Sequence, residues 1–281
     1  MGFTLSTKDL ATANASEYDQ IKRVIEPFRQ IFMTILENAE NDCVSHFTID
    51  RTYNPAVITL HPANGNNFSV SAKGRAAFPL SIPYDMQTAI LKFNQCDLSV
   101  LSLLCWIRDA LRPTGATVDW LMIVSVRPLS ILHYSDEEPV TRNGRHSVLA
   151  ITTASGEQYI ADFTIEQFGY PAELWFLQKA DYFTRFVEAG ASWRVASAED
   201  MDDAHCDIAE CDIQQPIRTC IDAVCKEINW LSYYKLSAEE RIPWLEARIR
   251  ETVGRLEAED GLDSTLEAAQ YRGKFINARQ V

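Results

Sequence analysis

The stretch from His146 to Thr164 constrains the fold more than any other part of this 281-residue chain. Two apolar runs, His146–Thr152 and Glu157–Thr164, lie on either side of Ser155–Gly156. Apolar runs of this length, separated by a few residues that include glycine, are typical of an antiparallel β-hairpin. We therefore expect β structure in the middle of the chain, with a tight turn at Ser155.

The position of that turn also predicts which side chains share a face of the hairpin. A turn centred on Ser155 places His146 opposite Thr164 and Val148 opposite Asp162. Opposed residues share a face, as do residues two apart, so His146 and Asp162 become diagonal neighbours with β-carbons roughly 7 Å apart. A slip of one residue would separate them. Aspartate is a poor strand former, which favours a specific role for Asp162 over a solvated pair at the strand ends.

A second informative segment is the predicted helix Asn94–Leu111. Asn94 is a suitable N-cap, and Asp97 three residues later gives a pattern like a capping box. Cys96 then lies in the first turn, where backbone N–H groups and the helix dipole stabilise a thiolate or an oxyanion. The alternative is an inert, buried thiol. The predicted buried stripe of this helix consists of Leu98, Leu101, Leu104, Cys105 and Leu111.

The remaining pattern predicts one α+β domain over residues 1–281. Its core lies at about 85–190, including a strand at 121–126 and a helix at 171–189. A helical N-terminal extension covers 16–43, where apolar residues recur at helical spacing. Further helices are expected within 213–258, one at 213–234 and one at 237–257.

Composition bounds the class of protein. The apolar fraction of 47% and the charged fraction of 23% are ordinary for a globular chain. A net charge of -13 disfavours non-specific binding to nucleic acid or anionic membranes. No apolar run reaches the length of a membrane span, and the N-terminus lacks the features of a secretory signal. Seven cysteines, an odd number, suggest reduced thiols in a cytoplasmic protein.

No cofactor or metal is expected from the motifs. The chain has neither a glycine-rich phosphate loop nor a Rossmann fingerprint. Cys206, Cys211, Cys220 and Cys225 are spaced more widely than the pairs of structural zinc sites, so inert thiols or a reversible disulfide are favoured. The acidic run 200–207 predicts a solvated loop, with binding of a cationic substrate group as the alternative.

The Cys and His–Asp segments together resemble the papain-like and transglutaminase-like thiol enzymes. Those enzymes place a cysteine at a helix start, a histidine opening a strand and an aspartate on the next strand. The stretches Asn94-Gln-Cys-Asp-Leu-Ser99 and Ala161-Asp-Phe-Thr-Ile-Glu-Gln-Phe-Gly169 carry the resemblance, which covers about residues 92–170. It implies a papain-like core with additional terminal helices. The site residues that it implies are the triad Cys96, His146 and Asp162, with Gln95 and Gln167 as oxyanion-binding or positioning residues.

The resemblance implies nucleophilic catalysis through an acyl-thioester on the cysteine. An amine acceptor gives an acyltransferase that forms amide or peptide bonds, which is the function we expect. Water as acceptor gives an amidase, deamidase or peptidase, and a non-catalytic binding module is a further alternative. The donor is expected to be a small molecule or an aminoacyl group. By analogy of fold and chemistry alone, arginine-type cyclodipeptide synthases suggest tRNA as the carrier, although the net charge disfavours tRNA.

Overall fold

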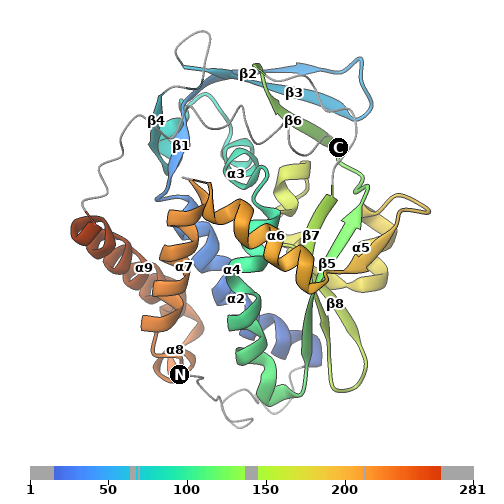
Figure 1. Cartoon of the computed structure of the whole chain (residues 1–281), viewed down its shortest axis with the longest axis vertical. Helices are drawn as coiled ribbons and strands as arrows, with labels where there is room; N and C mark the ends of the chain where they lie inside the picture. Colours follow the sequence, from blue (N-terminus) through green and yellow to red (C-terminus); the bar gives the residue numbers. More distant parts are fainter. Residues whose placement is uncertain (1–15, 64–67, 69, 137–144, 212, 261–281) are drawn as a thin grey trace.

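The computed structural model describes residues 16–63, 68, 70–136, 145–211 and 213–260. Within them the fold is α+β, built around a five-stranded antiparallel sheet of order β10-β5-β7-β8-β9 (Figure 1). This central sheet consists of β5 (Thr117–Val124), β7 (Arg145–Thr152), β8 (Gln158–Ala161), β9 (Phe176–Gln178) and β10 (Trp193–Val195).

The predicted hairpin is formed by β7 and β8, and its predicted register is confirmed. Leu149 pairs with Ala161 and Thr152 with Gln158. Continued by one residue, this register sets Val148 opposite Asp162, as expected from a turn at Ser155. The ladder ends at Ala161, so Asp162 lies just beyond the sheet. The 3-10 helix η3 (Ile165–Phe168) follows directly.

Helix α4 packs directly on strands β5 and β7, and helices α2 and α7 pack on α4, with α9 beyond them (Figure 1). Ser16 caps the start of α2 by accepting a hydrogen bond from the backbone N–H of Asp19 at 3.1 Å. The apolar face of α2 packs into the main hydrophobic core, which also contains residues of α4 and of the central sheet. The helices are α2 (Glu17–Leu36), α3 (Tyr84–Lys92), α4 (Cys96–Leu111), α5 (Lys179–Phe186), α6 (Ala198–Ala209), α7 (Gln214–Glu227), α8 (Trp230–Lys235) and α9 (Ala238–Asp260).

In the described part of the chain, no single helix has the length and hydropathy of a membrane span. The segments Tyr84–Lys92 and Cys96–Thr114 satisfy those criteria only as a joint pair, bent by 75°.

A second, smaller group of strands lies beside α3, at the top of Figure 1. Its three-stranded sheet has the order β2-β3-β6, with β3 antiparallel to β2 and parallel to β6. A separate hydrophobic cluster, including Leu60, Phe78 and Leu91, joins these strands to α3. Because the described residues form two separate hydrophobic clusters, one domain over residues 1–281 stays a prediction. The strands of this group are β1 (Glu40–Asp42), β2 (Val44–Asp50), β3 (Ala56–Pro62), β4 (Ser71–Lys73) and β6 (Ser130–Tyr134).

Several predicted elements are wrong or shifted. The expected helix 171–189 is a 3-10 helix η4 (Ala172–Trp175), strand β9 and the short helix α5, because Phe176–Gln178 pairs with β8 at the sheet edge. The extension 16–43 stops being helical at Leu36, where the chain turns into β1. The strand expected at 121–126 runs from Thr117 to Val124.

The C-terminal part also differs from the prediction. The segment expected as one helix at 213–234 is divided into α7 and α8. The acidic run 200–207 is part of helix α6 and not a loop, because Ser197 and Asp200 form a capping box that starts the helix. Its acidic residues thus lie on a helix whose buried residues, Ala204 and Ile208, pack into the main core.

Candidate active site

The structure brings His146 and Asp162 together in the interior. His146 is the second residue of β7 and is 1% exposed, while Asp162 is 0% exposed. Nε2 of His146 lies 2.8 Å from Oδ2 of Asp162. Because a carboxylate only accepts hydrogen bonds, Nε2 carries the proton and donates it. The ring of Phe168 packs perpendicular to the imidazole, with the two ring centroids 4.8 Å apart.

Asp162 is held by two further residues that sequence reasoning missed. The hydroxyl of Tyr182, on α5, donates to Oδ2 at 2.7 Å. The backbone N–H of Thr164 donates to Oδ1 at 3.0 Å, and its hydroxyl lies 3.3 Å from the same oxygen. The Thr164 contact is a turn in which an aspartate caps the backbone two residues on, which Asp-x-Thr suggests. No local pattern points to Tyr182, since it lies 20 residues away on an element predicted differently.

The buried pair shifts the pKa of both groups. Burial alone would lower the pKa of His146. The charge of Asp162 and its hydrogen bond outweigh burial, with a smaller contribution from Cys96, and raise that pKa to about 10. Burial alone raises the pKa of Asp162, yet His146, Tyr182 and Thr164 leave that pKa below its ordinary value. The preferred state is therefore an imidazolium paired with a carboxylate.

Cys96 is the first residue of α4 and is partly buried. It lies close enough to His146 to raise the pKa of the imidazole, in addition to the larger effect of Asp162. With Nε2 directed at Asp162, the second ring nitrogen faces the thiol. Nδ1 is buried and makes no hydrogen bond of good geometry in the described residues, either to Cys96 or to any other group. The three residues of the expected triad thus meet in the order Cys96, His146, Asp162.

The start of α4 differs from the expected capping box. Asn94 has a left-handed backbone with φ of 58°, a conformation that asparagine tolerates but that an N-cap does not use. The N-cap is Gln95, without a side-chain cap. Asp97 turns instead toward the sheet, where it accepts hydrogen bonds from Ser147 at 2.5 Å and from Arg145 at 2.7 Å. The helix start is therefore joined to the strand that carries His146.

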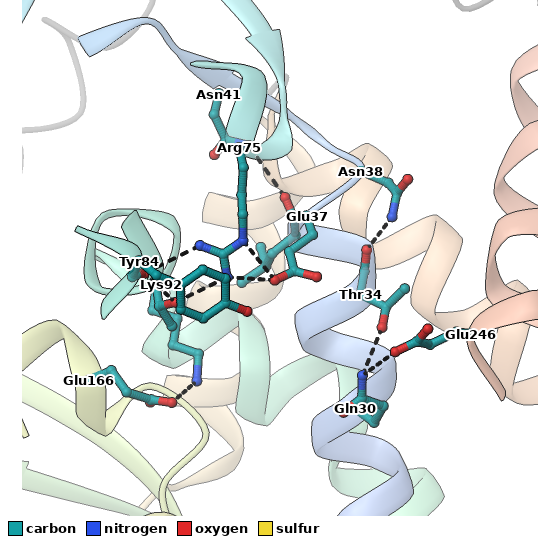
Figure 2. A network of polar contacts seen from close by, with 12 residues as sticks. Gln30, Thr34, Glu37, Asn38, Asn41, Arg75, Tyr84, Lys92, Glu166 and Glu246 are labelled. Carbon is teal, nitrogen blue, oxygen red and sulfur yellow. Dashed lines mark hydrogen bonds and ion pairs between the residues drawn. The ribbon is translucent and has the colours of Figure 1, made fainter. Parts of the chain in front are cut away.

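The turn after Asp162 contacts the segment that leads into Cys96. Oε1 of Gln167 accepts from the backbone N–H of Asn94 at 3.2 Å. Glu166 pairs with the fully buried Lys92 at 2.6 Å, the contact drawn at the lower left of Figure 2. Burial lowers the pKa of Lys92 to about 8, although Glu166 opposes that change. Gln167 thus lies where it positions the cysteine segment.

Gln95, the expected oxyanion donor, is joined to the C-terminal helices. Its side-chain oxygen accepts a hydrogen bond from Gln214 of α7 at 3.3 Å. The amide is therefore oriented by a helix that lies outside the stretch resembling the thiol enzymes. The backbone N–H of Gln95 is also used, since it donates to the carbonyl of Lys92 at 3.1 Å.

In the part of the chain that the structure describes, the other cysteines form neither a disulfide nor a metal site. Cys105 is exposed, so its expected place in the buried stripe of α4 is wrong, and Leu103 and Ile107 are buried there instead. Cys206 is exposed and Cys225 is buried, and none of the described cysteines is in a disulfide. No group of three His, Cys, Asp or Glu residues in the described ranges could hold a metal ion.

Comparisons with known proteins leave this site to be judged on its geometry. No protein-family model, no curated protein and no solved structure matches the chain.

Proposed function

We propose that the chain is a cysteine-nucleophile acyltransferase that forms amide bonds through an acyl-thioester on Cys96. The observation that carries the proposal is the buried contact of 2.8 Å between His146 and Asp162, with the thiol of Cys96 on the free side of the imidazole. A histidine oriented by a carboxylate and facing a nucleophile is the arrangement required to activate that nucleophile.

The first half of the reaction follows from these three residues. His146 is an imidazolium stabilised by Asp162 before the donor binds, because the proton of the Cys96 thiol has already passed to Nδ1, so that Cys96 pairs with it as a thiolate. The thiolate attacks the carbonyl carbon of the donor and forms a tetrahedral intermediate. The intermediate collapses to the thioester when the carbon–leaving group bond breaks and the imidazolium returns its proton to the leaving group.

The second half determines the class of enzyme. Neutral His146 takes a proton from the attacking amine, the amine displaces the thiolate, and an amide is released. Water in place of the amine would make the protein a hydrolase. Backbone N–H groups at the start of α4 are suited to hold the oxyanion in both halves, with the side chain of Gln95 as an additional donor.

A papain-like or transglutaminase-like core is part of this proposal. In support of it, Cys96 begins a helix that packs on an antiparallel sheet, His146 opens a strand of that sheet, and Asp162 follows the next strand. Asp162 is also followed by the Gln167–Phe168 pair, whose side chains contact the cysteine segment and the imidazole.

The first test measures thiol reactivity. Peptide mapping after brief iodoacetamide treatment at pH 7 should show Cys96 labelled faster than Cys105 and Cys206, although both of those are exposed and Cys96 is partly buried. His146→Gln should slow Cys96 to the rate of the exposed thiols without changing their rates. Equal labelling of Cys96 and Cys105 in the parent would refute an activated nucleophile and favour a binding module.

The second test looks for the thioester. Intact-mass analysis after incubation with cell extract should show an acyl adduct that neutral hydroxylamine removes. The adduct should map to Cys96 and be missing from Cys96→Ala, while Cys105→Ala should retain it. Supplied with an amine, the acylated protein should release an amide. Release of the free acid alone would identify a hydrolase.

A further inference from the structure

The carboxylate of Asp97 is shared by the nucleophile and a neighbouring arginine. Sγ of Cys96 lies 3.9 Å from Oδ1 of Asp97, and Ser147 donates to that oxygen at 2.5 Å. Nη2 of Arg145 donates to the other oxygen, Oδ2, at 2.7 Å. The thiol and the guanidinium therefore contact the two oxygens of one carboxylate. They are held as neighbours from two elements, α4 and β7.

Arg145 is accessible although it is held in place. Its side chain is 37% exposed, against 13% for that of Asp97. A guanidinium presents five N–H donors in one plane, and in the described residues Arg145 uses Nη2 for its contact with Asp97. The remaining donors suit a second carboxylate, which arginine binds with paired hydrogen bonds.

The two carboxylates whose charge acts on Arg145, Asp97 and Asp200, are both already hydrogen-bonded. The charge of Asp200 acts on Arg145 more weakly than that of Asp97. Asp200 accepts hydrogen bonds from Arg194 at 2.6 Å and from the hydroxyl of Ser197 at 2.6 Å. Because Asp97 and Asp200 are each paired with an arginine, they are poor partners for a cationic substrate. An anionic group therefore fits the exposed side of Arg145 better than a cationic group.

We propose that Arg145 recognises a carboxylate of the acyl donor, close to the carbon that Cys96 attacks. The inference rests on the proposed function, since it assigns the substrate class of the same site. The donor is then an anionic acyl compound whose carboxylate pairs with the guanidinium, while its carbonyl carbon faces the thiol. Asp97 and Ser147 are positioning residues, because they fix the guanidinium beside Cys96.

The test compares two alkylating reagents that differ in a carboxylate. A thiolate displaces iodide from both iodoacetate and iodoacetamide, but only iodoacetate carries a carboxylate next to the attacked carbon. The ratio of the iodoacetate rate to the iodoacetamide rate is measured at Cys96 and, as an internal reference, at the exposed Cys105 of the same molecule. We expect the ratio at Cys96 to exceed that at Cys105 by about tenfold, the effect of one charge-assisted hydrogen bond.

Two variants identify the residue responsible. Arg145→Gln should reduce the ratio at Cys96 to that of Cys105 while iodoacetamide still labels Cys96 quickly. Arg108→Gln is the matched control, because Arg108 lies on α4 and pairs with Asp119, away from the thiol. It removes the same charge and should leave the ratio at Cys96 unchanged. A thermal melt and the iodoacetamide rate establish that each variant retains its fold.

The other outcomes separate the two proposals. An unchanged ratio in Arg145→Gln, with fast iodoacetamide labelling, overturns the carboxylate assignment and leaves the nucleophile intact. Equal slowing of both reagents also overturns it, because Arg145 would then act by neutralising Asp97 beside the thiol. If Cys96 in the parent reacts with iodoacetamide no faster than Cys105, the proposed function itself is refuted.

Discussion

Replacing Asp162 by asparagine should change the pH dependence of stability in a way that can be calculated from the structure. The pKa of His146 rises from 6.5 to about 10 on folding, through Asp162. Because the folded pKa lies above the unfolded one, the stabilisation is fully present below pH 6.5. It is lost as the pH rises toward 10. In Asp162→Asn only burial acts strongly on His146, and burial lowers its pKa, so this contribution disappears.

The magnitude follows from linkage between protonation and folding. With those two pKa values, the imidazolium contributes about 5 kcal/mol at pH 6, about 3 kcal/mol at pH 8 and under about 1 kcal/mol at pH 10. The parent should therefore exceed Asp162→Asn in unfolding free energy by an amount that shrinks steadily over this range. Urea denaturation of both proteins at the three pH values measures the difference.

Tyr182→Phe is the matched control for this experiment. It removes a hydrogen bond of 2.7 Å to the same carboxylate oxygen but leaves both charges of the pair. Burial raises the pKa of Tyr182 well above 10, so its hydroxyl does not titrate between pH 6 and 9. The loss, about 1–3 kcal/mol for a buried acceptor, should be nearly constant across that range. A constant difference for Asp162→Asn as well would refute an imidazolium–carboxylate pair.

Two further predictions concern buried side chains. Cys96→Ala should abolish the thioester adduct and cost about 1 kcal/mol or less, whereas Cys225→Ala, in the main core at 1% exposure, should cost about 1–2 kcal/mol and lower the Tm without affecting the adduct. Equal Tm values for Cys96→Ala and Cys225→Ala would contradict this prediction. Glu166→Gln should cost more than Lys92→Met, because it leaves Lys92 and Arg29 without their shared carboxylate, with about 3–5 kcal/mol expected for a broken buried pair. Urea titrations of the two variants decide the order.

The fold around the site could be predicted where one local pattern determines the structure. The turn at Ser155 fixes which residues of β7 and β8 are opposed, so the common face of His146 and Asp162 follows from counting. The apolar period that predicts α2 is equally local. The segment 171–189 failed because Phe176–Gln178 is a strand only through its pairing with β8, a contact that no local pattern contains.

By itself, then, the sequence determined the helix that carries Cys96, the hairpin register, and the order of the three site residues. The tertiary structure alone decided the surroundings of those residues. Tyr182 reaches Asp162 from a helix 20 residues away, and Arg145 reaches Asp97 across 48 residues. The exposure of Cys105 was likewise decided by which face of α4 packs on the sheet. The physical reason is that backbone periodicity is set by neighbouring residues, whereas burial, charge pairing and pKa depend on contacts between distant segments.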